Sequence, residues 1–205
     1  MENAQNFYRA IESRRTIRKF KKKKIPKESL LRLIRAAIWA PSAHNAQPWH
    51  FIIITSNKIK EKLAVSMGKK FREDLLADGF PEEECEERVK ASIERMVNAP
   101  VLIIACLTMR NMDKYPDEKR QKAEYVMAVQ SVAAAIQNLL LAAHVEGLGA
   151  CWRCAPLFAK EIVRKVLNIP EDVEPQALIE VGYPDEKPSP PSRKPIEEVL
   201  HWEGW

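Results

Sequence analysis

Three arginines lie within five residues near the start of the chain, and their spacing predicts an anion-binding site. Arg14, Arg15 and Arg18 follow an amphipathic stretch expected to be helical, and Thr16 adds a hydroxyl donor in the same turn. A guanidinium group makes planar, charge-assisted bonds to two phosphate oxygens at once. Each such bond contributes on the order of 1.5 to 3 kcal/mol, so three or four of them can hold a phosphate monoester. A solvated basic surface is the alternative, because lysines follow at positions 21–24.

A second candidate site is the loop enclosed by Pro41 and Pro48. Ser42, Asn45 and Gln47 offer hydroxyl and amide groups that both donate and accept hydrogen bonds. Such groups on a loop stiffened by proline are suited to the polar edge of a heteroaromatic ring. The alternative is an ordinary connection between a helix and a strand, whose side chains satisfy its own backbone.

The cysteines supply a third candidate, because Cys151 and Cys154 are separated by two residues. Such a pair is found in redox sites and in metal sites. A zinc site needs two more ligands, and neither Cys85 nor Cys106 has a suitable spacing. A thioredoxin-like pair begins a helix after a strand, whereas this pair lies in a predicted strand and Pro156 starts the helix afterwards. We therefore interpret both cysteines as small packing residues and expect no metal.

Several common enzyme motifs are absent from the sequence. It contains no Gly-x-Gly-x-x-Gly, no phosphate loop ending in Gly-Lys-Ser, no His-Glu-x-x-His and no Gly-x-Ser-x-Gly. The net charge of +5 suggests an anionic partner. Nucleic acid is the obvious candidate, but Phe20 is the only aromatic residue in the basic run, so a stacking surface is missing. A basic nucleic-acid-binding module remains the alternative from another functional class.

Length and composition favour one folded domain over residues 1–205. The chain is 46% hydrophobic and 30% charged, which excludes low-complexity disorder. No stretch approaches the roughly 20 uninterrupted apolar residues of a membrane span, so no membrane association is expected. The first residues lack the apolar run of a signal peptide, which predicts a cytoplasmic protein with reduced cysteines.

Hydrophobic periodicity predicts the elements that must position these groups. Helices are expected up to about residue 14, after Pro26, over 58–96 with a break at 78–81, over 121–145 and over 157–167. Strands are expected at 50–55, 101–107, 150–153 and 177–182. The helix over 121–145 is apolar on nearly every face and must be covered all round, in part by a partner subunit. This order predicts an α/β or α+β sandwich.

The segment 184–205 is expected to be an extended tail. It is rich in proline and carries Trp202 and Trp205. Exposed indoles lower solubility, so we expect this tail to pack against another surface.

Four segments in this order and spacing resemble the flavin-dependent nitroreductase family. They are RRTIRKF at 14–20, APSAHNAQPW at 40–49, GLGACW at 147–152 and PSRKP at 191–195. The resemblance covers the chain from end to end. It implies an α+β fold, an α-β-α sandwich whose mostly antiparallel central sheet is flanked by helices. It also implies a homodimer with the C-terminal tail exchanged between subunits and two FMN molecules at the interface.

The resemblance also implies which residues bind FMN. The set consists of Arg14, Arg15, Thr16, Arg18, Pro41, Ser42, Asn45, Gln47, Arg95, Cys154, Ala155 and Arg193. The arginine segment and Arg193 would bind the ribityl phosphate, and the loop at 41–47 would meet the flavin from the other subunit. Backbone amides of Cys154 and Ala155 would lie near N5 of the ring, and Arg95 would lie near N1 and O2.

The implied reaction transfers hydride from NADH or NADPH through flavin N5 to a nitro, quinone or other small conjugated acceptor. It needs no catalytic side-chain nucleophile, and Arg95 would stabilise the anionic reduced flavin. Thr16 stands where the family usually has serine, and residues 153–155 occupy a stretch that is commonly richer in glycine in the family. The charged segment 67–97 is expected to be a helical insertion able to form a lid. The alternatives are therefore reductive dehalogenation, a larger pathway-specific substrate, or a flavin-binding domain that sequesters or fragments its cofactor.

Overall fold

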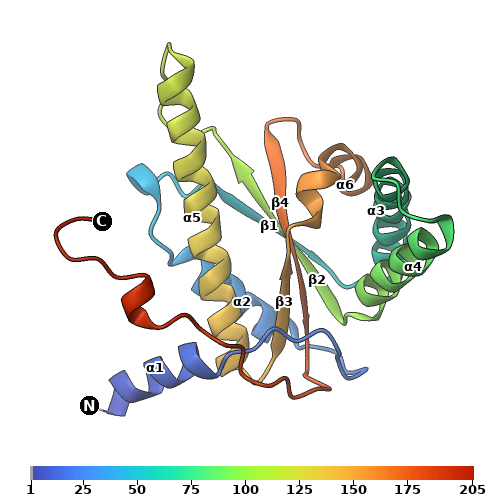
Figure 1. The fold of residues 1–205 in the computed structure, drawn as a ribbon, viewed down its shortest axis with the longest axis horizontal. Helices are drawn as coiled ribbons and strands as arrows, with labels where there is room; N and C mark the ends of the chain where they lie inside the picture. Colours follow the sequence, from blue (N-terminus) through green and yellow to red (C-terminus); the bar gives the residue numbers. More distant parts are fainter. Residues whose placement is uncertain (1) are drawn as a thin grey trace.

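The computed structural model describes residues 2–205, with side chains from residue 4 onward, and contains a four-stranded sheet between two layers of helices (Figure 1). The strands are β1 (Trp49–Ile54), β2 (Val101–Thr108), β3 (Gly149–Arg153) and β4 (Val173–Gly182). Their order in the sheet is β1-β2-β4-β3, and every neighbouring pair is antiparallel. The predicted α+β fold with an antiparallel central sheet is confirmed.

The central strand β2 is buried over its whole length, which explains its apolar sequence. Side chains alternate between the two faces of a strand. Ile103 and Leu107 therefore belong to one hydrophobic core, whereas Leu102 and Ile104 belong to the other. The sheet thus needs helical cover on both faces.

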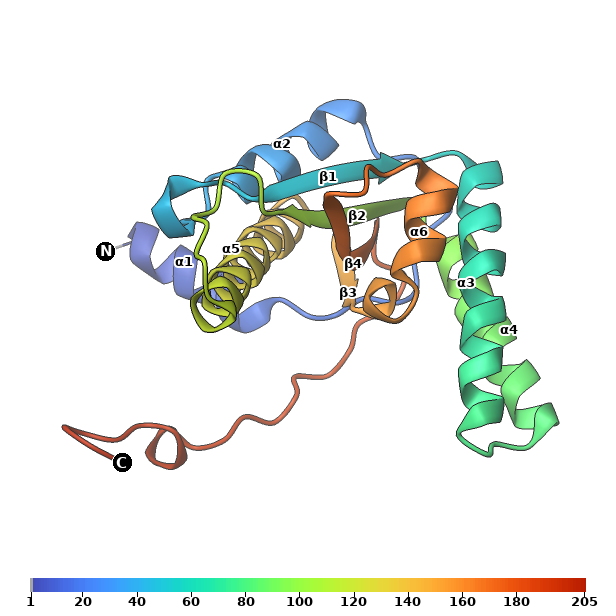
Figure 2. The ribbon, with the colours of Figure 1, turned by 90° about the horizontal axis from the view of Figure 1, so that it is seen from above.

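One face is covered by α2 (Lys27–Ile38) and α5 (Glu118–Val145), and the other by α3 (Asn57–Ala77), α4 (Glu82–Asn98) and α6 (Lys160–Leu167), whereas the exposed helix α1 (Glu2–Ser13) packs on α5 rather than on the sheet. Figure 2 shows the two layers on opposite sides of the sheet. Helices α3 and α4 form an antiparallel pair, joined at Asp78 to Pro81 where the sequence predicts a break. This arrangement matches the sandwich implied by the resemblance.

The long helix α5 lies in the core and contacts both α2 and β2. Judged by length and composition alone, it is the one helix among the described residues that could cross a membrane. Its buried residues include Ala128, Val132, Ile136 and Leu139, as expected for the core helix of a folded domain. The expected cover is incomplete in the single chain, because Val145 is 72% exposed.

The segment 184–205 runs away from the body of the chain (Figure 2). It contains one short 3-10 turn, Ile196–Glu198, and both Trp202 and Trp205 are exposed. Pro184 and Asp185 at the start of the tail contact Phe20 and Lys19, but the expected packing of the two tryptophans is not found among the described residues of the single chain. Packing against a partner subunit stays a prediction.

Two element boundaries differ from the sequence prediction. Strand β4 begins at Val173 rather than near residue 177 and contains Pro175, opposite a register shift between Ala105 and Cys106. Proline donates no ladder hydrogen bond and is tolerated where the pairing is irregular. The sequence pattern therefore predicts the start of this strand too late. The predicted helix over 157–167 is a 3-10 turn, Ala155–Phe158, followed by α6.

Candidate functional site

The arginine segment, residues 14–20 after α1, lies directly against the sheet. The amide of Ile17 donates a hydrogen bond of 3.0 Å to the carbonyl oxygen of Ala150, and Thr16 forms an isolated bridge with Ala150. Two glycines make this close approach possible. A Cβ atom on Gly149 would lie 2.6 Å from Cβ of Ile17, and one on Gly182 would lie 2.7 Å from the Phe20 ring. The segment is therefore fixed by its backbone and apolar residues, so the arginine side chains are not needed to hold it.

Arg18 and Arg95 line one cavity, although they are far apart in the sequence. The cavity has a volume of about 550 Å³, and its lining is formed by Arg18, Lys19, Phe20, Lys22, Ala91, Glu94, Arg95 and Asn98. We call it the basic cavity. Among the described side chains, no ion pair is formed by Arg18 or Arg95, and the Arg95 Nε donates only to the Ala91 carbonyl oxygen at 3.2 Å. Two cationic groups are thus available to an anionic ligand.

The positive field of these arginines reaches β3. Burial and the Glu180 carboxylate raise the pKa of the Cys151 thiol, while Arg18, Arg153 and Arg95 act in the opposite direction. The charges of Arg18, Arg95 and Arg153 therefore all act on one residue of β3, the strand that precedes Cys154 and Ala155.

Arg14 and Arg15 lie close to the C-terminal end of α5. Arg15 donates to the backbone carbonyl oxygens of Glu12 at 2.6 Å and of Arg14 at 2.8 Å. Burial lowers the pKa of His144, and the charges of Arg14 and Arg15 lower it further. Both arginines are half-buried, so their charges act in a partly desolvated setting.

Arg193 is exposed on the tail and donates to the Ser192 carbonyl oxygen at 3.0 Å. Over residues 2–205 of the single chain, no hydrogen bond or ion pair joins it to the arginine segment. Instead, the Glu186 carboxylate accepts from the backbone amides of Arg18 at 2.5 Å and Lys19 at 3.0 Å. A carboxylate oxygen therefore already occupies one anion-binding position on this segment.

The loop at 41–48 lies beside α5, on the face of the sheet opposite to α3 and α4. Its short 3-10 helix, Ala43–Asn45, is tied to α5 because the Ala43 amide donates to the Ser131 hydroxyl oxygen at 3.2 Å. Ser42 accepts from the Gln47 amide at 3.1 Å, so this hydroxyl satisfies the loop's own backbone, as in the simpler interpretation. Pro41 and Ser42 also line a shallow hollow against α5. In one chain this loop and the basic cavity are separate.

Cys154 and Ala155 follow β3, and Ala155 lines a second cavity of about 350 Å³. Its walls come from the 153–159 segment and from α3 and α4, namely Met67, Lys70, Phe71, Asp74, Asp78, Ser92, Met96, Arg153, Ala155, Phe158 and Ala159. We call it the apolar cavity. The segment 67–97 therefore forms one wall of a cavity beside Ala155. Cys154 is exposed and Cys151 is buried, and no disulfide joins them.

The sequence pattern did not predict the ion pair between Arg153 and Glu180. Arg153 Nη1 lies 3.0 Å from Glu180 Oε1, and Arg153 Nη2 donates to the Ser92 hydroxyl at 3.0 Å. Glu180 is completely buried in β4. A single acidic residue within the apolar run 177–182 was the available signal, because a buried carboxylate requires a partner.

The comparisons with known proteins agree on one family. The sequence profile described as Nitroreductase family matches residues 11–183. A protein of Methanothermobacter thermautotrophicus with the provisional name NADH dehydrogenase/NAD(P)H nitroreductase is 34% identical over 181 residues, covering 87% of this chain and 78% of that protein.

Two solved structures share the fold over nearly the whole chain. A BluB-like flavoprotein from Clostridium difficile superimposes with a TM-score of 0.82 at 28% identity, covering 97% of this chain and 99% of that one. A provisionally named nitroreductase from Desulfovibrio desulfuricans, solved in complex with FMN, gives a TM-score of 0.72 at 26% identity, covering 97% and 96%.

Proposed function

Because the chain belongs to the nitroreductase family of flavin oxidoreductases, we propose that it binds FMN and uses NADH or NADPH to reduce a small nitro, quinone or other conjugated acceptor. The observation that carries this proposal is the basic cavity, which is lined by both Arg18 and Arg95, two guanidinium groups that form no ion pair among the described side chains. A phosphorylated, electron-accepting ring system needs both a cationic clamp and an adjoining apolar surface.

The residues present fit FMN. Arg14, Arg15, Thr16 and Arg18 offer the hydrogen-bond donors that a phosphate monoester requires. The Glu186 carboxylate on the Arg18 and Lys19 amides supports this assignment, since a negatively charged group is already accepted there. When bound, FMN would supply the hydride-transfer chemistry. Arg95 would neutralise negative charge at the pyrimidine edge of the ring.

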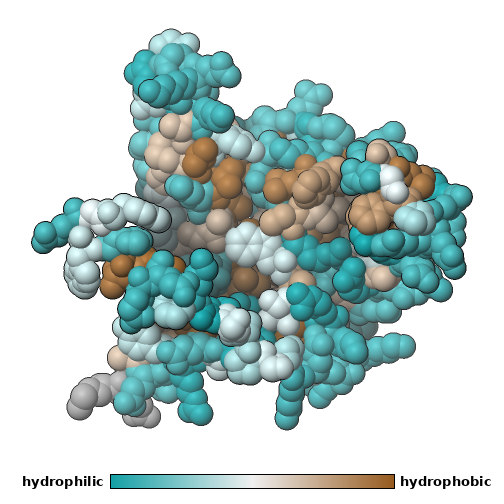
Figure 3. Space-filling model, viewed as in Figure 1, coloured by the Kyte–Doolittle hydropathy of each residue, from teal (hydrophilic) through white to brown (hydrophobic). Residues whose placement is uncertain are grey.

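A homodimer with exchanged tails would complete the site. Phe7, Ile11, Trp39 and Val145 are exposed around an apolar groove of about 550 Å³ between α1, α2 and α5. Figure 3 shows further apolar side chains on the surface over α5 and around α6. Covering such a surface with a second subunit removes apolar area from water. It would also bring the 41–48 loop and Arg193 of one subunit to the flavin of the other.

The apolar cavity is the proposed acceptor pocket. Met67, Phe71 and Met96 provide an apolar wall for a conjugated ring, and Arg153 provides a donor for a nitro or carbonyl oxygen. Part of this wall belongs to the 67–97 segment, which would act as the lid. This wall also supports the alternative of a halogenated or larger substrate.

The test combines Arg14→Ala with Arg193→Ala and measures FMN affinity from the absorption of bound flavin. Losing charge-assisted bonds at both positions should weaken binding by about 100-fold to 10,000-fold, at roughly 1.5 to 3 kcal/mol for each. The double variant Arg9→Ala with Lys194→Ala removes neighbouring exposed charges and serves as the control. Circular dichroism and gel filtration establish that both variants remain folded dimers.

Two results would contradict the proposal. Unchanged FMN affinity in the first variant would remove the phosphate clamp from the site. A wild-type protein that takes up no FMN and oxidises no NADH or NADPH would remove the activity. Retention on DNA that falls steeply with salt and depends on Arg18 would favour the nucleic-acid alternative.

A further inference from the structure

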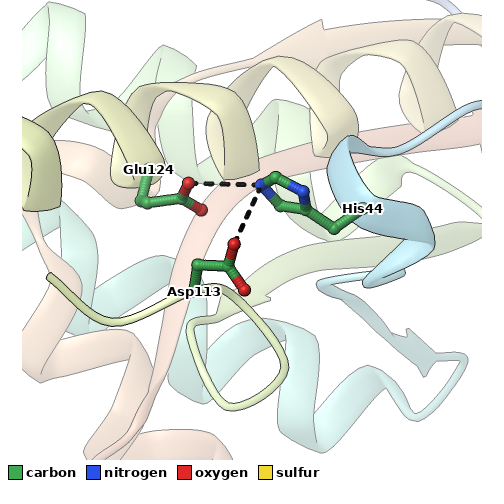
Figure 4. A group of neighbouring side chains, drawn as sticks. All are labelled: His44, Asp113 and Glu124. Carbon is green, nitrogen blue, oxygen red and sulfur yellow. Dashed lines mark hydrogen bonds and ion pairs between the residues drawn. The ribbon is translucent and has the colours of Figure 1, made fainter.

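A histidine and two carboxylates meet where the 41–48 loop contacts α5 (Figure 4). His44 Nε2 lies 3.2 Å from Glu124 Oε1 and 3.9 Å from Asp113 Oδ2. One ligand atom from each residue lies within 4.8 Å of the other two. The three side chains come from separate elements, namely the 3-10 turn after α2, the loop after β2, and α5.

The buried carboxylate of Glu124 is incompletely satisfied. Its side chain is only 2% exposed, and among the described residues nothing forms a hydrogen bond with Oε2. In Figure 4 the carboxylate points toward His44 and Asp113. A buried carboxylate oxygen without a partner is costly, and native structures satisfy such atoms with protein groups, water or an ion. The free oxygen therefore marks a position that a water molecule or an ion would satisfy.

The charges of the cluster are unbalanced. Asp113 and Glu124 contribute two negative charges, whereas His44 contributes at most one positive charge. A divalent cation would balance the carboxylates while His44 remains neutral and coordinates through Nε2.

We propose that His44, Asp113 and Glu124 bind one divalent transition-metal ion, such as Zn²⁺, that fastens the 41–48 loop to α5. One imidazole and two carboxylates suit zinc or manganese, whereas magnesium and calcium prefer oxygen ligands alone. Three protein ligands leave a position for water in a four-coordinate site.

The geometry requires only a small adjustment. Ligand atoms at about 2.1 Å from a zinc ion in a tetrahedral site lie roughly 3.4 Å apart. The separation of His44 and Glu124 already approaches this value. Asp113 must approach His44 Nε2 by about half an ångström and must also come within ligand spacing of Glu124, which an exposed side chain on a loop can do, since 57% of it is exposed.

The test uses the purified full chain with its bound flavin, stripped of metal by a chelator and then titrated with Zn²⁺. Metal analysis after dialysis should give one zinc ion for each chain. Asp113→Asn, His44→Gln and Glu124→Gln should each weaken zinc binding by at least about tenfold, since even outer-shell substitutions cost that much. A zinc excess of 100-fold over Kd should raise Tm by about 5 to 10 °C in the wild type.

His50→Gln is the matched control, because His50 is another exposed histidine, on β1. It should bind zinc with unchanged affinity. Asp113→Asn alters an exposed side chain and keeps the experiment informative if Glu124→Gln does not fold. Absence of stoichiometric zinc binding overturns the proposal and leaves a plain ion pair between His44 and Glu124. Zinc affinity that is equal in the wild type and Asp113→Asn also overturns it.

Discussion

Removing Arg153 should destabilise the fold more than neutralising its partner Glu180. Glu180 is completely buried, whereas 21% of the Arg153 side chain is exposed. Replacing Arg153 with methionine leaves an uncompensated charge in the core, at a cost of about 3 to 5 kcal/mol. Glu180→Gln instead leaves a guanidinium group that reaches solvent and still donates to Ser92, so we expect a smaller cost of about 1 to 3 kcal/mol.

A double replacement sharpens this prediction. Arg153→Met combined with Glu180→Leu removes both charges and fills the space with apolar atoms. Because a buried ion pair contributes little net stability over packed apolar residues, the double variant should lie within about 1 kcal/mol of the wild type. It should therefore be more stable than Arg153→Met alone.

The assay is equilibrium unfolding in urea at a fixed protein concentration, with and without added FMN. Glu161→Gln is the control, because this carboxylate also pairs with an arginine but is 81% exposed, so its loss should cost less than about 1 kcal/mol. Equal destabilisation by Arg153→Met and Glu180→Gln would refute the asymmetry. A double variant as unstable as Arg153→Met would refute the role of the unpaired charge.

Two further predictions concern close packing and alkaline pH. Gly149→Ala forces a Cβ atom toward Ile17 and should lower the free energy of unfolding by about 1 to 3 kcal/mol, whereas Gly204→Ala, with nothing within 4 Å of the added atom, should leave urea unfolding unchanged. Burial raises the pKa of the Cys106 thiol from 9.0 to about 12, so the unfolded thiol loses its proton first. Stability should therefore fall by roughly 1.4 kcal/mol for each pH unit between those two values, and Cys106→Ala should remove this component of the slope. Equal pH slopes in the two proteins would contradict the second prediction.

The regular elements could be predicted because their sequences are locally consistent. The run 101–107 is apolar on both faces, and the structure covers both faces of β2. The break at 78–81 ends one charged helix and begins the next. The start of β4 was predicted too late because Pro175 pairs across an irregular position, which depends on the neighbouring strand rather than on local sequence.

The candidate site was only partly accessible from the sequence. The arginine segment was identified from residue type, but the cavity that Arg18 shares with Arg95 depends on how α4 lies beside residues 18–22. The Arg153 and Glu180 pair and the His44 cluster join residues from different elements. Their partners carry no characteristic spacing, so only the tertiary arrangement reveals them. The expected contacts between subunits depend on a second chain and stay predictions.

The helix α4 connects the two cavities. Ala91, Arg95 and Asn98 follow one helical stripe and line the basic cavity, whereas Ser92 and Met96 follow the adjacent stripe and line the apolar cavity. A rotation or shift of α4 therefore changes both cavities together, since a packed helix moves as a unit. If the basic cavity holds FMN and the apolar cavity holds the acceptor, any movement of α4 that widens the apolar cavity also moves Arg95. Acceptor size and flavin affinity should then be coupled through this helix.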